Sequence, residues 1–122
     1  MLKQKVEKAN ESMLPLKWIR YQIPPGFTIK NSEFKVNVYL NSANFLGLVS
    51  FYKSTFERNA SFAEATFNGE AKFSGAKFNE EAYFHTTFEQ QVNFSEATFN
   101  GEVYFIDNAI KGIIKLKTNI VS

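Results

Sequence analysis

Phenylalanine recurs along the middle of the chain at a nearly constant interval. Twelve phenylalanines run from Phe45 to Phe105, and the gaps between them alternate between five and six residues, with a single gap of four. A small or β-branched residue stands two positions before almost every one of them, as Ala65 does before Phe67. The repeating unit is therefore a small residue, a variable residue and a phenylalanine, and linkers of two or three residues join successive units.

This spacing predicts short strands and not a helix. At about 100° per residue, the apolar positions that follow Phe62 would point all around a helix axis and form no stripe. In an extended chain, residues two positions apart lie on the same face, so the small residue and the phenylalanine would point inward together. The residue between them, such as Lys72 or Lys77, is then expected to point outward. Linkers such as 68–70 are built from turn-forming residues.

Strands this short are stable only if successive coils of the chain stack, about 4.8 Å apart, as a solenoid. With four faces, one coil takes 22 residues, and the chain holds about four and a half coils. A flattened, two-sided coil is the alternative geometry. Continuing the five/six alternation outward predicts apolar residues at six further positions, where the sequence has Ile29, Phe34, Leu40, Ile110, Leu116 and Val121.

Stacking of four-sided coils predicts four columns of inward side chains. The first is Ile29, Phe51, Phe73, Phe94 and Leu116, the second Phe34, Phe56, Phe78, Phe99 and Val121, the third Leu40, Phe62, Phe84 and Phe105, and the fourth Phe45, Phe67, Phe88 and Ile110. One link, 84–88, is a residue short, and His85, the only histidine, lies in it. We interpret His85 as an exposed turn residue in a tight corner.

Four stretches carry the unit most clearly: residues 65–69, 71–75, 76–80 and 97–101. They resemble the pentapeptide repeat family, in which a small residue, a variable residue and a leucine or phenylalanine are followed by two more residues. The resemblance implies an all-β fold, a right-handed quadrilateral β-helix. The chain departs from the family by an extra residue in every second link, which affects the corners and leaves the solenoid intact.

The N-terminal residues predict a cap on the solenoid. Residues 2–13 carry an apolar stripe of helical spacing, namely Leu2, Val6, Ala9 and Met13. Pro15 ends the helix, residues 16–23 form one strand, and the turn at 24–26 leads into the first coil. The expected division is therefore a helix and cap over 1–26 and a β-solenoid over 27–122. A basic amphipathic membrane anchor is the alternative role for the helix.

The C-terminal residues are expected to leave an open edge. They carry more apolar side chains than half a coil can bury, because Ile113 and Ile120 fall outside the inward positions. No capping element follows them in the sequence, and an open β-edge is a pairing site. The hypotheses are a homodimer through the C-terminal end, which would close the edge by two-fold symmetry, or a longer solenoid of which this is a fragment.

Charge and composition exclude several classes of function. The net charge of +2 is unevenly spread: +4 over residues 1–40, −5 over 41–108 and +3 over 109–122. That distribution forms no single basic patch, so nucleic-acid binding is not expected. The sequence has no cysteine and one histidine, so it lacks the thiolate ligands of many metal sites and the residues of most catalytic triads. We predict no catalytic, cofactor-binding or metal-binding residue, no membrane span, and a cytoplasmic location.

The sequence favours a non-catalytic structural or protein-interaction module whose partner is unknown. Tyr83 and Tyr104 lie one coil apart at outward positions and form the candidate contact surface, together with Ile113 and Ile120. The family resemblance supplies the alternative, a DNA-mimicking modulator of a topoisomerase such as DNA gyrase. A charge of −5 over 68 residues is a poor match to one charge per ~1.7 Å of duplex. An enzyme and a membrane-associated accessory domain are the remaining hypotheses.

Overall fold

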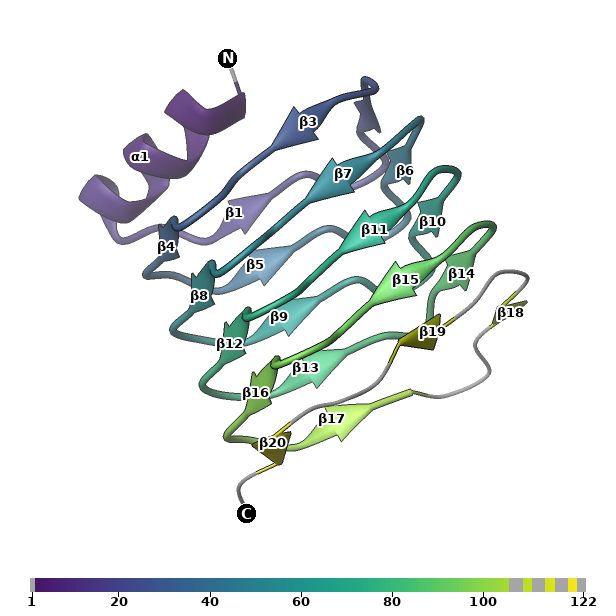
Figure 1. Cartoon of the computed structure of the whole chain (residues 1–122). Helices are drawn as coiled ribbons and strands as arrows, with labels where there is room; N and C mark the ends of the chain where they lie inside the picture. The colour runs from purple at the N-terminus through teal and green to yellow at the C-terminus, as the bar shows by residue number, and fades with distance from the viewer. Residues whose placement is uncertain (1, 106–108, 111–113, 116–118, 121–122) are drawn as a thin grey trace.

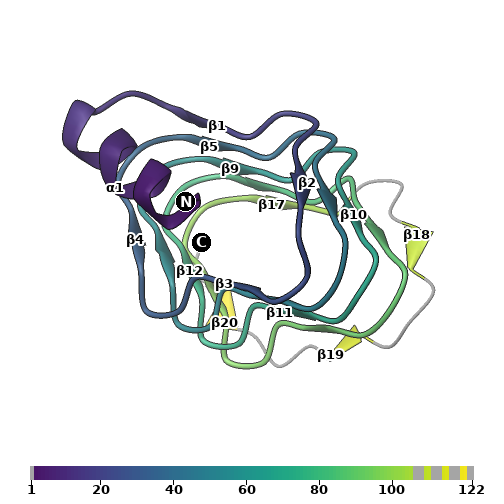
Figure 2. The same ribbon diagram turned by 90° about the horizontal axis from the view of Figure 1, so that it is seen from above.

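The computed structural model describes residues 2–105, 109–110, 114–115 and 119–120. It is a solenoid of four parallel sheets with one short helix at its N-terminal end (Figure 1). Viewed along its axis, each coil is a quadrilateral whose sides belong to the four sheets (Figure 2). The predicted fold class is thereby confirmed, and the two-sided alternative is wrong.

Each sheet contains five two-residue strands stacked in order along the axis. Sheet A holds β1 (Leu16–Lys17), β5 (Val38–Tyr39), β9 (Ala60–Ser61), β13 (Ala82–Tyr83) and β17 (Val103–Tyr104). Sheet B holds β2 (Gln22–Ile23), β6 (Asn44–Phe45), β10 (Thr66–Phe67), β14 (Thr87–Phe88) and β18 (Ala109–Ile110). Sheet C holds β3 (Phe27–Thr28), β7 (Val49–Ser50), β11 (Ala71–Lys72), β15 (Val92–Asn93) and β19 (Ile114–Lys115). Sheet D holds β4 (Glu33–Phe34), β8 (Thr55–Phe56), β12 (Lys77–Phe78), β16 (Thr98–Phe99) and β20 (Asn119–Ile120).

The core consists of columns of stacked phenylalanine rings. Along one column, the ring centroids of Phe56 and Phe78 are 4.8 Å apart and those of Phe78 and Phe99 are 5.0 Å apart, and the ring planes lie within 7° of parallel. These spacings are close to the strand repeat of a sheet, so one ring per coil fills its column without gaps. The small residues two positions earlier are buried beside the rings, as Ala76 and Ala97 are.

The side chains between small residue and ring point outward, as predicted. Lys77 is exposed and Lys72 half-buried, while their neighbours Phe78 and Phe73 are almost completely buried. No helix interrupts residues 45–105.

The two link lengths produce two kinds of corner. In a five-residue link, the carbonyl of the inward ring accepts a hydrogen bond from the amide three residues on, as Phe62 does from Ala65 at 3.0 Å. The residue before that amide has a positive φ, 61° at Glu64, which is the geometry of a type II turn. In a six-residue link the coils approach closely: a Cβ on Gly69 would come within 2.5 Å of the backbone of Gly47. The extra residue thus changes the corner and leaves the columns unchanged.

The short link at 84–88 is completed by a side chain. The Oγ1 of Thr86 donates a hydrogen bond to the carbonyl oxygen of Phe62 in the coil above, at 2.9 Å. His85 is exposed, and its carbonyl accepts the amide of Glu64. His85, Glu64, Thr86 and Thr87 line a shallow hollow of about 250 Å³.

The first coil begins earlier than the sequence indicated. Residues 16–23 form two strands, β1 and β2, and not one, because a turn with a positive φ at Arg20 separates them. Trp18 and Ile23 are almost completely buried and continue the columns of Leu40 and Phe45. Strand pairing therefore crosses the expected boundary between 1–26 and 27–122. The turn at 24–26 lies within a coil, between β2 and β3.

Helix α1 (Leu2–Ser12) lies across the N-terminal coil. Its residue Val6 is buried, with only 4% of its surface exposed. The prediction that Met13 belongs to its apolar stripe is wrong, because Met13 has a φ of 56° and is 63% exposed. The backbone amide of Met13 donates a hydrogen bond to the carbonyl of Asn10, and the amide of Leu14 donates one to the carbonyl of Ala9. This pair of hydrogen bonds is the Schellman motif, which ends a helix.

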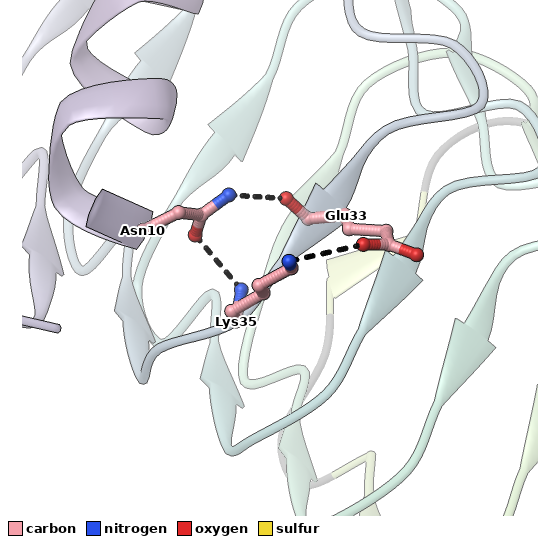
Figure 3. Close-up of polar contacts among 3 residues, drawn as sticks. All are labelled: Asn10, Glu33 and Lys35. Carbon is pink, nitrogen blue, oxygen red and sulfur yellow. Dashed lines mark hydrogen bonds and ion pairs between the residues drawn. The ribbon is translucent and has the colours of Figure 1, made fainter.

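The helix is attached to the first coil by the side-chain amide of Asn10 (Figure 3). Its Nδ2 donates to the carbonyl of Glu33 at 2.8 Å, and its Oδ1 accepts the backbone amide of Lys35 at 2.9 Å. Glu33 belongs to β4, the first strand of sheet D, so Asn10 supplies hydrogen bonds that a preceding strand would otherwise make. Lys35 and Glu33 also form an ion pair of 3.7 Å.

At the C-terminal end, the strand register differs from the expected columns. Ile120 in β20 is the partner of Phe99, a position that the five/six alternation gave to Val121. The sequence offered no means of choosing, because Ile120 and Val121 are adjacent and both apolar. Leu116 and Val121 themselves lie outside the described residues.

Candidate interaction surface on sheet A

The outer face of sheet A carries aromatic side chains in a single column. Each strand of this sheet turns its first residue inward and its second outward, because side chains alternate along an extended chain. From β1 to β17, the outward residues are Lys17, Tyr39, Ser61, Tyr83 and Tyr104. We call this column the tyrosine face. Tyr39 is a member that the sequence analysis missed, although it lies 44 residues before Tyr83, which is two coils.

Tyr83 and Tyr104 stack on each other at the outer surface. Their ring centroids are 4.9 Å apart and their planes differ by 5°. The separation follows from the register, which pairs the two residues directly in β13 and β17. Both side chains are half-buried, so the rings shield each other's faces and leave their edges accessible. The sequence prediction that these two tyrosines stack one coil apart and point outward is confirmed.

Each of these tyrosines donates a hydrogen bond to a glutamate two residues earlier. The hydroxyl of Tyr83 lies 2.7 Å from Oε1 of Glu81, and that of Tyr104 lies 2.7 Å from Oε2 of Glu102. The bonds fix both rings and orient both carboxylates along the corner beside sheet A. A tyrosine two residues after a glutamate is the sequence signal for this pair, and the sequence analysis named the two tyrosines without their glutamates.

These contacts raise the pKa of both hydroxyls. For Tyr104 the hydrogen bond to Glu102 is the largest cause, followed by burial and the charges of Glu102 and Glu81, and together they raise the pKa to about 12. The pKa of Tyr83 is raised from its ordinary value by the same kinds of contact, with the bond to Glu81 first. Both tyrosines are therefore neutral hydrogen-bond donors at physiological pH.

The corner beside the tyrosine face also ties the coils together. The Oδ1 of Asn37 accepts the amide of Asn59 at 3.1 Å, and the Oδ1 of Asn59 accepts the amide of Glu81 at 3.0 Å. Asparagine at this corner bonds to the next coil, whereas Glu81 and Glu102 bond to the tyrosines. The upper half of the corner is thus neutral and structural, and the lower half presents two carboxylates next to two aromatic rings.

Such a surface is suited to contact with another macromolecule. Half-buried tyrosines whose hydroxyls are already hydrogen-bonded lose little conformational freedom on binding and offer large contact areas. Of the other predicted contact residues, Ile113 lies outside the described residues, and only the backbone of Ile120 is described. Interaction through the C-terminal end, including a homodimer, stays a prediction.

The described residues show little that points to other chemistry. Across residues 2–105 and the described strands beyond them, no three histidine, cysteine, aspartate or glutamate side chains are grouped so that they could hold a metal ion. In the same part of the chain, no helix has the length and hydropathy needed to cross a membrane.

Comparison with known proteins identifies the repeat. A family model described as pentapeptide repeats (9 copies) matches two overlapping stretches of the chain, residues 29–77 and 40–87. No curated protein and no solved structure matches the chain significantly. The matched stretches span coils whose strands, corners and ring columns are those described above.

Proposed function

Residues 29–87 belong to the pentapeptide repeat family, and from this premise we propose that the protein is a non-catalytic interaction module whose partner binds the tyrosine face. The coil geometry of the matched residues continues without interruption to Tyr104, so the face extends beyond the matched stretch. The inward residues of every coil serve the core, which leaves the outward columns as the part of the molecule free to contact a partner.

The stacked pair of Tyr83 and Tyr104 is the observation that supports this proposal. Tyrosine is enriched among the residues that contribute most to binding at protein interfaces. The other three sheets carry smaller, uncharged polar residues at the equivalent positions of the coil that contains β13: Thr87 in sheet B, Asn93 in sheet C and Thr98 in sheet D. The aromatic column is therefore particular to sheet A.

Substitution of both tyrosines tests the proposal. The double variant Tyr83→Ser, Tyr104→Ser should keep the fold, because Ser61 occupies the same column, and should lose the partner. The matched control is Thr87→Ser, Thr98→Ser, which changes outward residues of sheets B and D. A binding protein recovered with the wild type and the control, but not with the tyrosine variant, is the expected result. Equal recovery with all three proteins would contradict the proposal.

The alternative, a DNA mimic that acts on a topoisomerase, is less favoured by the distribution of charge. The outward positions of β11 and β12 are Lys72 and Lys77, where a duplex would present phosphates. A supercoiling assay with DNA gyrase separates the two functions. Inhibition at micromolar protein that survives the two tyrosine substitutions would support the mimic and count against the interaction module.

A further inference from the structure

A basic pocket lies between helix α1 and the first coil. Its volume is about 400 Å³, and its walls come from the helix and from residues 14–21. Lys5 and Lys8, three residues apart on α1, line it together with Lys17, the outward residue of β1. Figure 2 shows α1 beside the corner at which β1 begins, and residues of both elements line this pocket.

The three lysines have no negative partner in the pocket. No carboxylate lines it, and no ion pair joins any of the three to a glutamate in the part of the chain that the structure describes. Lys5 is held over the ring of Tyr21, 5.3 Å from its centroid, and its Nζ lies 3.4 Å from the hydroxyl oxygen. Lys5 and Lys8 carry like charges three residues apart on a helix and therefore repel each other. A bound anion would reduce this repulsion.

The remaining wall of the pocket is apolar. Leu14 is 62% exposed, and Pro15 and Leu16 continue the wall towards Trp18. The pocket thus combines a positively charged side with a hydrophobic one. A phosphate carries a charge of about −1.5 to −2 at pH 7 and accepts several hydrogen bonds, which matches three ammonium groups better than a single carboxylate does.

We propose that this pocket binds a phosphate-bearing anion, with the phosphate held by Lys5, Lys8 and Lys17. The phosphate belongs either to a soluble ligand or to the headgroup of a lipid, and both would be recognised by the same three lysines. This site shares Lys17 with the tyrosine face but includes none of its tyrosines, and binding of the anion does not depend on the partner proposed above.

Trp18 provides a direct probe, since it is the only tryptophan of the chain and lines the pocket. Its ring stacks on Tyr21 at 6.2 Å, and Tyr21 in turn contacts Lys5, so an anion that draws Lys5 away alters the surroundings of the indole. Titration with inorganic pyrophosphate at constant ionic strength is expected to give a saturable change in fluorescence. Calorimetry of the same titration detects binding that leaves the fluorescence unchanged.

Two double variants with the same change in net charge make the test specific. Lys8→Gln, Lys17→Gln removes two of the three cations, whereas Lys72→Gln, Lys77→Gln removes two lysines from sheets C and D. We expect the pocket variant to bind pyrophosphate at least about tenfold more weakly and the control to bind like the wild type. Equal weakening in both variants, or no saturable binding by the wild type in either the pyrophosphate or the vesicle experiment, would overturn the proposal.

Sedimentation with vesicles distinguishes the two sources of phosphate. Vesicles that contain phosphatidylglycerol are compared with vesicles of phosphatidylcholine alone, for the wild type and both variants. Binding to the anionic vesicles that is lost in the pocket variant identifies a lipid headgroup, and pyrophosphate binding without vesicle binding identifies a soluble ligand. Vesicle binding that is equal in the pocket variant and the control would contradict recognition by this pocket.

Discussion

Single residues decide what each outward position of the coil can do. At the corner beside sheet A, Asn59 accepts the backbone amide of Glu81, whereas Glu102 accepts a tyrosine hydroxyl. Both residues are polar and occupy the same column, but the uncharged amide serves the backbone and the carboxylate fixes an aromatic ring. Within two coils, the residues of this corner change from bonding the backbone to bonding the tyrosines of the proposed interaction surface.

The tyrosine hydroxyls should respond to removal of their glutamates. Because Glu102 is the main cause of the raised pKa of Tyr104, Glu102→Gln should lower that pKa from about 12 towards its ordinary value of 10.0. The difference between titrations of tyrosinate absorbance with and without Tyr104→Phe isolates this hydroxyl. Glu96→Gln, which changes an exposed glutamate at another corner, is the control and should leave the titration of Tyr104 unchanged.

The same shift makes stability depend on alkaline pH. The folded state holds the proton of Tyr104 more tightly than the unfolded chain, so the stabilisation is complete below about pH 10 and is lost as the pH rises towards about 12. Thermal unfolding of the wild type and of Glu102→Gln should therefore converge across this range. Parallel pH profiles of the two proteins would show that the hydrogen bond is absent in solution.

At the scale of the element, helix α1 takes the place of a missing strand. The side-chain amide of Asn10 donates to and accepts from the backbone around β4, which has no strand above it in sheet D. Side-chain amides are suited to this task because, like the peptide group, they carry both an N–H donor and a carbonyl acceptor. The helix thereby protects an edge that would otherwise be open to another chain.

Loss of this amide should loosen the edge of sheet D. Asn10→Ala removes two hydrogen bonds, each worth about 0.5–1.5 kcal/mol net. A loss of about 1–3 kcal/mol corresponds to about 5- to 150-fold faster exchange of the Lys35 amide where exchange follows local opening. Gln4→Ala, at an exposed position of the same helix, is the control. Exchange at Lys35 that is equally fast in both variants would exclude the proposed anchoring role of Asn10.

The elements could be predicted from the sequence wherever one side chain fills one column. Phe56, Phe78 and Phe99 repeat the same ring in the same place, so their spacing alone specifies strand, corner and coil. Trp18 and Ile23 fill the columns of Leu40 and Phe45, but they differ in type from the phenylalanines and are followed by two prolines, so the first coil was missed. The role of Asn10 depends on where the helix lies on β4, which no local pattern encodes.

The candidate surface could be predicted only in part. The positions of Tyr83 and Tyr104 follow from the repeat, since an outward residue one coil later lies in the next rung. Their bonds to Glu81 and Glu102 depend on side-chain conformation at a corner whose geometry the sequence left open. The basic pocket was beyond prediction for a different reason: it needs the helix placed against the first coil before Lys8 and Lys17 are neighbours.

At the scale of the whole molecule, stability is distributed along one axis. Each coil contacts only the coils next to it, so an interior ring is supported on both sides and an end ring less completely. Phe73 stacks between Phe51 and Phe94, with ring centroids 5.2 and 5.0 Å away. Phe34 stacks on Phe56 alone. The position of a residue along the axis should therefore determine the cost of losing it.

Replacing phenylalanines at different positions along the solenoid axis by alanine measures how the free energy of unfolding depends on that position. Phe73→Ala should lower the free energy of unfolding by about 3–5 kcal/mol, because it leaves a cavity between two coils that cannot collapse. Phe34→Ala should cost less, since the first coil can adjust against the helix. Denaturant unfolding of the two variants provides the comparison, and equal losses would contradict the one-dimensional description of the molecule.

Detachment of the helix should open the solenoid from its N-terminal end only. Val6 is the single fully buried residue of α1, so Val6→Asp should release the helix from the first coil. Strands β1–β4 then lose their cover, and their amides should exchange rapidly in a hydrogen-exchange experiment. Strands β8–β16 should remain protected, because their neighbouring coils are intact.

Gln4→Asp introduces the same charge at an exposed position of the same helix and should leave every strand protected. The uncovered edge of the first coil should also promote association of Val6→Asp in sedimentation at tens of micromolar, as unpaired strands of two molecules meet. A uniform loss of protection from β1 to β16 would mean that the coils unfold as one unit. Unchanged protection at β1–β4 would mean that the helix is dispensable, and that the first coil is stable through its own ring contacts, such as the edge-to-face contact of Trp18 with Phe27.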